Sequence, residues 1–220
     1  MEEFVLSATR KVGLLRFGIS IWFLSAALEV GSVGVQGREI PLDGVLNTRD
    51  LGGLRTEDGH TVRTGQLIRS GEIDDINAEG KARLDSMRVT TIVDLRTTSE
   101  ASASPASWPG NSGPARYNFP LMEKESEDID QMRANIKAGL AKPEDTEALF
   151  FGAFGSIATD YSSEIRELFE VLLAQPEGEA VLFHCSGGKD RTGVATAVVL
   201  SALGVKMEDI EADFMMSNVQ

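Results

Sequence analysis

The sequence predicts an α/β fold with a central, mostly parallel sheet flanked by helices, and three observations predict it. β-branched and apolar runs at 89–95 and 181–183 are typical of buried parallel strands. Segments with helical spacing of apolar residues alternate with them, at 77–87 and 161–173. A short loop rich in glycine joins the second strand to an apolar helix, as in the ligand-binding turns of such sheets.

The first 37 residues have two alternative interpretations. An apolar run at 17–28 follows three basic residues and precedes a stretch of small residues, which resembles a secretory signal peptide. The run is shorter than the roughly 20 apolar residues that a transmembrane helix needs, and two glutamates near the start argue against a signal. The alternative is an N-terminal extension, or a start placed too far upstream, that packs loosely or not at all. The folded domain is therefore expected over 38–220.

The first half of this domain is expected to hold short strands, a hairpin and one helix. The extended segments are predicted at 40–46, 66–70 and 89–95. An Asp-Gly pair within 57–60 predicts a small hairpin that exposes His60. An amphipathic helix is predicted at 77–87. The connection from 99 to 120 is rich in Ser, Ala, Gly and Pro, and we expect little regular structure in it before an extended piece near 117–121.

The second half begins with an acidic, helix-prone stretch at 122–152, which predicts a solvated helix face or, alternatively, a mobile cover over a site. A helix is predicted at 161–173. The strand from Val181 and the buried helix at 194–203 follow, and a last helix is expected from Met207 to Met216.

The stretch 181–193, VLFHCSGGKDRTG, carries the chemistry. The only cysteine of the chain, Cys185, begins the loop, and Arg191 stands six positions later. Helix N-termini and neighbouring cations favour the reactive thiolate form of cysteine. Successive backbone N–H groups over 186–191 can converge on an oxyanion, and the planar fork of Arg191 matches two phosphate oxygens. The alternative for a lone free cysteine is an inert buried thiol.

This pattern predicts a two-step displacement through a cysteinyl-phosphate. The nucleophile is Cys185, and the acid that protonates the leaving oxygen is Asp190, with Asp94 as second choice. The residues expected to cradle the phosphate are Ser186, Gly187, Gly188, Lys189, Thr192 and Gly193. Thr192 is also expected to donate a hydrogen bond to the sulfur, and His184 to fix the loop through backbone contacts.

Three further residues are candidates for a supporting role. Arg49, at the centre of the turn 47–53, is expected either to reach the same anion or to form a structural salt bridge. Asp94 and Arg96 follow the strand 89–95 at the sheet edge where ligands gather, and the alternative is an ion pair that fastens the next loop.

The composition and charge of the chain limit the classes of molecule that it is expected to bind. A net charge of -13 and a pI near 4.6 argue against nucleic acid, which needs a broad basic surface. A single cysteine allows no internal disulfide, and a reactive thiol favours a reducing, cytoplasmic compartment. If residues 1–37 are a signal, export of the protein is the alternative to a cytoplasmic location. Contact with a membrane is expected only under that alternative. Nothing in the sequence predicts an oligomeric partner.

The motifs resemble a known family. The segment HCSGGKDRTG at 184–193 closely resembles the HCxAGKDRTG signature of atypical bacterial tyrosine phosphatases, which are related to dual- and lipid-specific cysteine phosphatases. Three more segments are similar to elements of that family: NTRDLGG at 47–53, VDLR at 93–96 and DFMMSN at 213–218.

The resemblance implies a cysteine-phosphatase fold and activity on phosphotyrosine proteins, extending in some members to phosphoserine, phosphothreonine or phosphoinositides. It implies Cys185 as nucleophile, Arg191 as phosphate clamp, Asp190 as acid, and Lys189 as a cation that favours highly charged phosphates. It implies no metal or cofactor. The chain departs from the family at Gly187, where alanine is usual, and in ending soon after the DFMMSN segment, which predicts truncated C-terminal helices and a loss of stability or activity.

Two rival functions remain at this level. The first is a phosphate-binding or interaction module without catalysis, left by the truncation. The second, a sulfur-transfer enzyme with a similar cysteine loop, does not account for Lys189, Asp190 and Thr192.

Overall fold

The computed structural model describes residues 38–105, 108, 113–123, 131, 134–140, 142, 152, 154–157 and 159–218. The predicted N-terminal extension, 1–37, lies outside the described residues, and so does most of the acidic stretch 122–152.

Five strands form one sheet in the order β1-β2-β5-β3-β4. Their bounds are Arg49–Asp50 (β1), Leu67–Ser70 (β2), Val89–Asp94 (β3), Ala115–Asn118 (β4) and Ala180–His184 (β5). Only the β1–β2 pair is antiparallel, because the connection 51–66 returns along the same edge of the sheet without crossing it. The mostly parallel sheet that the sequence predicts is therefore confirmed.

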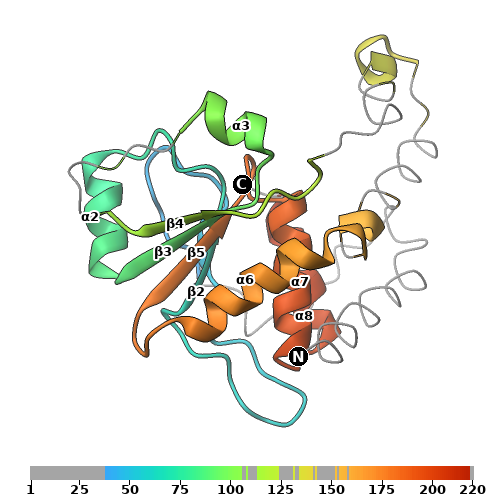
Figure 1. Ribbon diagram of the computed structural model, residues 1–220. Helices are drawn as coiled ribbons and strands as arrows, with labels where there is room; N and C mark the ends of the chain where they lie inside the picture. The colour runs from blue at the N-terminus through green and yellow to red at the C-terminus, as the bar shows by residue number, and fades with distance from the viewer. Residues whose placement is uncertain are drawn as a thin grey trace.

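Helices cover both faces of this sheet. Their bounds are Ala78–Ser86 (α2), Thr98–Ala103 (α3), Ser162–Ala174 (α6), Asp190–Ala202 (α7) and Met207–Met216 (α8). Figure 1 shows α2 on one side of the sheet and α6, α7 and α8 on the other. The predictions of α2, α6, α7 and α8 are confirmed. Within the described ranges, no helix has the length and apolar character needed to cross a bilayer.

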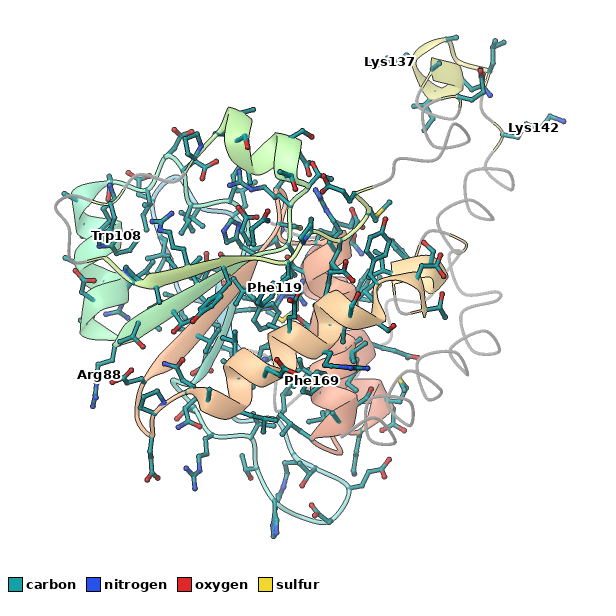
Figure 2. The ribbon with its side chains drawn as sticks, viewed as in Figure 1. Arg88, Trp108, Phe119, Lys137, Lys142 and Phe169 are labelled. Carbon is teal, nitrogen blue, oxygen red and sulfur yellow. The ribbon has the colours of Figure 1, made fainter. Side chains whose placement is uncertain are left out.

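The central strand β5 separates two apolar clusters, because its successive side chains point to opposite faces. Phe183 packs with α6 and α7, whereas Leu182 packs with the α2 side. Phe119 and Phe169 belong to the same cluster as Phe183, and Figure 2 shows both between the sheet and its helices. All five residues of β5 are buried. The loop that leaves β5 therefore starts from a fully buried central strand.

The register of the strands brings three loops together. Ser70, the last residue of β2, pairs with His184, the last of β5, and His184 pairs with Asp94, the last of β3. Parallel strands that end level with one another place their following loops at one edge of the sheet. The residues after 70, 94 and 184 are thus neighbours.

The connection 99–120 differs from the prediction, because it begins with the helix α3. Thr97 caps this helix: its hydroxyl accepts from the Glu100 N–H at 3.2 Å, and the Glu100 carboxylate accepts from the Thr97 N–H at 2.9 Å. This reciprocal capping box satisfies two N–H groups that a short helix leaves unpaired. The Ser and Ala content indicated a loop, but the capping pair outweighs it and fixes where Glu100 stands.

Candidate active site

The loop 185–189 joins β5 to α7 and begins with Cys185, which is only 3% exposed. Gly188 has a φ of 65° and packs so closely on the end of β2 that an added Cβ would lie 2.4 Å from the Gly71 nitrogen. Glycine is needed at this position both for its left-handed backbone and for this close approach.

Four consecutive carbonyl groups of this stretch are held from outside the loop. The donors lie on or next to β1, β2 and β5: His184 Nδ1 donates to the Cys185 oxygen (3.2 Å), Glu72 N–H to the Ser186 oxygen (2.9 Å), Asn47 Nδ2 to the Gly187 oxygen (2.7 Å) and Arg69 Nη2 to the Gly188 oxygen (2.7 Å). In a trans peptide the N–H points away from the preceding C=O. Fixing these carbonyls therefore turns the N–H groups of 186–189 to the other side.

The result is a ring of free donors. Within the described part of the chain, the N–H groups of 186–189 donate to no carbonyl. The first-turn N–H groups of α7 at 190–192 add to them, because they have no acceptor within the helix. Converging N–H groups at a helix N-terminus bind oxyanions such as phosphate.

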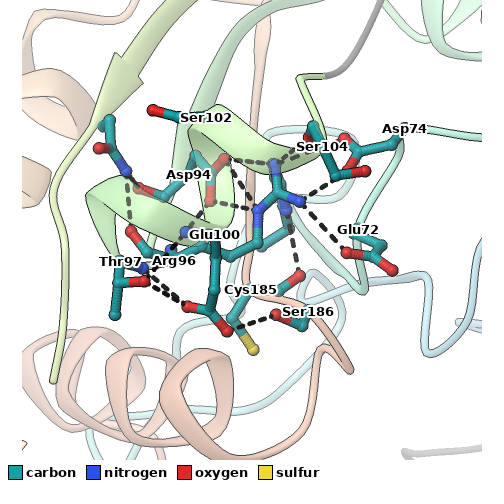
Figure 3. A network of polar contacts seen from close by, with 12 residues as sticks. Glu72, Asp74, Asp94, Arg96, Thr97, Glu100, Ser102, Ser104, Cys185 and Ser186 are labelled. Carbon is teal, nitrogen blue, oxygen red and sulfur yellow. Dashed lines mark hydrogen bonds and ion pairs between the residues drawn. The ribbon is translucent and has the colours of Figure 1, made fainter. Parts of the chain in front are cut away.

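Arg191 lies at this helix start and binds the carboxylate of Glu100 from α3. Its Nη1 and Nη2 lie 2.5 and 2.9 Å from the two carboxylate oxygens. Ser186 Oγ donates to the same carboxylate at 3.1 Å, and Figure 3 shows Glu100 turned toward Ser186 and the loop. The fork of Arg191 is thus already arranged for a planar or tetrahedral oxyanion.

Comparison with known proteins decides what this arrangement is. A family model described as the tyrosine phosphatase family matches residues 40–220. The chain belongs to the tyrosine phosphatase family. This match confirms the family and the class of enzyme that the motifs predict.

Two curated relatives are described as protein phosphatases. A tyrosine-protein phosphatase of Cupriavidus necator is 33% identical over 85% of this chain and 66% of its own length. The triple specificity protein phosphatase PtpB of Mycobacterium tuberculosis is 29% identical over 82% of this chain and 69% of its own. The chain spans about two thirds of the length of these relatives. Among solved structures, Pseudomonas aeruginosa TpbA in complex with phosphotyrosine aligns over 70% of each chain, at 17% identity and a TM-score of 0.39.

The loop 185–189, called the phosphatase loop from here on, contains two adjacent glycines at which we expect alanine to have different effects. Gly188→Ala places a Cβ against backbone atoms of 70–71 in a left-handed conformation, which costs about 1–3 kcal/mol of unfolding free energy and distorts the ring of donors. Gly187→Ala meets nothing within 4 Å and leaves stability within about 0.5 kcal/mol. Urea unfolding and aryl phosphate turnover of both variants measure this. Equal effects of the two substitutions would contradict the geometry.

The Glu100–Arg191 pair changes the titration of both groups. The hydrogen bonds from Arg191 lower the pKa of Glu100 from 4.5 to about 2. Burial lowers the pKa of Arg191, but the Glu100 carboxylate more than offsets burial, so this pKa lies above its ordinary value. Both groups are charged at neutral pH, and the pair persists unless another anion displaces Glu100.

This pair predicts an acid-sensitive contribution to stability. Because the pKa of Glu100 is lower in the folded state, its contribution is complete above about pH 4.5 and is lost as the pH falls toward about 2. We expect Glu100→Gln to remove that part of the pH dependence, measured as the free energy of unfolding in urea at pH 2 to 7. Glu79→Gln, in the first turn of α2, serves as the control and should retain the wild-type slope. A Glu100→Gln curve that parallels wild type would contradict the prediction.

Arg96 and Asp94 adopt the ion pair that was their alternative interpretation. Arg96, 1% exposed, donates to both Asp94 oxygens, to Asp74 at 2.6 Å and to Glu72 at 3.2 Å. Burial lowers the pKa of Arg96, but its hydrogen bonds to the carboxylates of Asp94 and Asp74, together with their negative charges, more than offset burial and raise the pKa above its ordinary value. The cluster ties the loops after β2 and β3 together beside the phosphatase loop, so Arg96 is engaged by carboxylates.

Arg49 likewise adopts its alternative role as a structural salt bridge. It is fully buried, and its Nε lies 3.0 Å from Asp213 on α8. Its other donors reach the Asp213 carbonyl, Ser217 and the Asn47 carbonyl. The arginine at the centre of NTRDLGG therefore joins the first strand to the last helix, and the neighbouring Asn47 is the residue of this motif that reaches the loop.

The remaining predicted residues lie on the loop or on α7. Asp190 is half-buried, and its carboxylate forms no hydrogen bond within the described ranges. Thr192 Oγ1 is buried without a hydrogen-bond partner there, so the predicted bond to the Cys185 sulfur is not formed. Gly193 does not face the cradle: its N–H donates to the Lys189 carbonyl, and it packs against Phe214 of α8. Lys189, the last residue of the loop, is half-buried.

His184 is buried, and burial lowers its pKa, which favours the neutral ring. Its Nε2 lies 3.9 Å from Asp94, and its Nδ1 holds the loop carbonyl as predicted. No group of His, Cys, Asp or Glu in the described ranges has the geometry of a metal site.

Proposed function

We propose that the protein is a protein-tyrosine phosphatase that hydrolyses phosphomonoesters through a cysteinyl-phosphate. The observation that carries this proposal is the ring of inward N–H groups at 186–189, with Cys185 at one end and the Arg191 fork at the other. A phosphate held there has its phosphorus next to the sulfur and its oxygens on fixed donors. Such donors cost no reorganisation when charge develops in the transition state.

The reaction has two steps. In the first, the Cys185 sulfur bonds to phosphorus, the bond from phosphorus to the tyrosyl oxygen breaks, and that oxygen takes a proton from Asp190. In the second, the Asp190 carboxylate takes a proton from water, the water oxygen bonds to phosphorus, and the sulfur–phosphorus bond breaks. The products are tyrosine and inorganic phosphate. Substrate must displace Glu100 from at least part of the Arg191 fork.

The structure favours Asp190 over Asp94 as the acid. Asp94 has both oxygens engaged by Arg96, whereas the Asp190 carboxylate forms no hydrogen bond within the described ranges. An acid must be free to approach the leaving oxygen, and proximity to the loop gives Asp190 that position.

The acid assignment predicts the behaviour of Asp190→Asn. We expect kcat on phosphotyrosine peptide to fall about 100-fold, and the loss to shrink on aryl phosphates whose leaving groups need no proton. Steady-state kinetics on both substrate types measure the difference. Asp209→Asn is the matched control, because Asp209 is a half-buried carboxylate in the first turn of α8 and should leave both rates unchanged. A full rate on poor leaving groups assigns the acid elsewhere.

The substrate class is tested with a panel of phosphotyrosine, phosphoserine and phosphothreonine peptides and phosphoinositides. We expect the highest kcat/KM on phosphotyrosine. A higher kcat/KM on phosphoinositides would identify the substrate as a lipid instead of a protein. If the protein is folded but turns over none of these substrates, the result would favour a phosphate-binding module without catalysis. A free thiolate at Cys185 requires reducing conditions, which supports the proposal of a cytoplasmic location.

A further inference from the structure

A buried ion cluster lies behind the phosphatase loop. Three guanidinium groups converge on the carboxylate of Asp213: Arg38 (3.0 Å), Arg49 (3.0 Å) and Arg69 (2.7 Å). None of their side chains is more than 8% exposed. The cluster has two positive charges more than negative ones, and buried charge of one sign is costly unless something compensates it.

Arg69 differs from the other two arginines because it touches the loop. Its Nη1 binds Asp213, and its Nη2 donates to the Gly188 carbonyl at 2.7 Å and more weakly to the Lys189 carbonyl at 3.5 Å. Arg38 instead donates to the backbone of Asp50. One side chain of β2 thus connects α8 to the back of the loop.

Arg69 remains charged in this position. Burial lowers its pKa to about 10; the Asp213 carboxylate opposes this decrease, and the positive charge of Arg49 adds to it. The pKa of Asp213 is raised by burial, but the arginines outweigh burial and keep it below its ordinary value. At neutral pH a positive charge therefore stands directly behind the Gly188–Lys189 peptide.

We propose that Arg69, held by Asp213, is a positioning residue for phosphate binding: it fixes the Gly188–Lys189 peptide so that the Lys189 N–H faces the phosphate. The inference rests on the proposed function for the identity of the anion. Arg69 acts through the peptide and touches no substrate atom. Its positive charge also lowers the cost of bringing a dianion to the other side of the same peptide.

The test compares Arg69→Met with Arg38→Met in the full chain. Each variant removes one arginine from Asp213, but only the first releases the Gly188 carbonyl. We measure the dissociation constant of inorganic phosphate by calorimetry, KM and kcat on p-nitrophenyl phosphate, and the free energy of unfolding. We expect Arg69→Met to raise the dissociation constant about 10- to 100-fold, the effect of losing a charged hydrogen bond, with a parallel rise in KM. Arg38→Met should change it less than about twofold.

Arg69→Lys provides a second variant that keeps the charge. Lysine presents a compact ammonium in place of the planar fork that spans Asp213 and Gly188, so phosphate affinity should lie between wild type and Arg69→Met. If Arg69→Met does not fold, an unchanged affinity in Arg69→Lys overturns the proposal. Equal losses in the Arg69→Met and Arg38→Met variants also overturn it, because they would indicate a purely structural cluster.

The outcomes separate this inference from the proposed function. Phosphate binding that depends on Arg69, without any hydrolysis, supports the inference about Arg69 and overturns the proposed phosphatase function. Hydrolysis together with a phosphate affinity that does not depend on Arg69 supports the proposed function and overturns the inference about Arg69. Absence of phosphate binding in the wild-type protein overturns both.

Discussion

Replacement of Cys185 by serine is expected to abolish turnover of phosphotyrosine peptide, with kcat at least about 1000-fold below wild type. The serine hydroxyl is not ionised at neutral pH, whereas the thiolate is the nucleophile of the first step. Phosphate binding should persist, because the inward N–H groups and Arg191 are unchanged. Stopped-flow and steady-state assays measure the rate, and calorimetry with inorganic phosphate measures the binding.

The two measurements give the Cys185→Ser result its meaning. Lost turnover with retained phosphate affinity assigns the chemical step to the sulfur. Turnover within tenfold of wild type would falsify the cysteinyl-phosphate. Since Cys185 is the only cysteine, a phosphothiol that is trapped during turnover of a phosphotyrosine peptide with a radiolabelled phosphate group can lie only on this residue.

The second large effect is expected for Arg191→Lys, with kcat/KM reduced about 100- to 1000-fold. Lysine keeps the charge, but its single ammonium cannot hold two phosphate oxygens as the guanidinium fork does. Steady-state kinetics on p-nitrophenyl phosphate measure the loss. The matched control is Arg63→Lys, an exposed arginine paired with the exposed Glu177, which should leave kcat/KM unchanged.

The Arg191→Lys variant also loses the bidentate bond to Glu100, so substrate has less to displace. We therefore expect the loss to appear more in kcat than in KM. If the variant retained kcat and lost only substrate affinity, Arg191 would bind the bound substrate and the transition state equally well. That result would contradict a specific role of Arg191 in stabilising the transition state.

The sequence predicted the sheet, four of the helices and the loop because each has a strong local signal. The run 89–95 is β-branched, α7 is almost wholly apolar, and the stretch 184–193 carries a specific motif. The residues that it failed to identify act across long distances in the chain. Glu100 was assigned to a loop although Thr97 and Glu100 form a recognisable capping pair.

Arg69 shows why part of the site was not predictable. In the sequence it is a single charged residue near the end of a short strand, and no motif around it marks it as part of a site. Only the register that pairs Arg69 with Phe183 of β5 brings it behind the loop. Arg49 was recognised as unusual, but choosing between an anion and a salt bridge required knowledge of where Asp213 of α8 lies.

The position of Asp213 has a consequence for how the molecule folds. Arg69 and Arg38 precede this carboxylate by 144 and 175 residues, and contacts between such distant parts of a chain form slowly because their loop-closure entropy must be overcome first. Until α8 docks, neighbouring guanidinium groups repel one another without a counter-ion. We therefore expect the phosphatase loop to acquire its final shape late in folding, after the sheet has formed. The appearance of catalytic activity during refolding would then report that the whole domain has assembled.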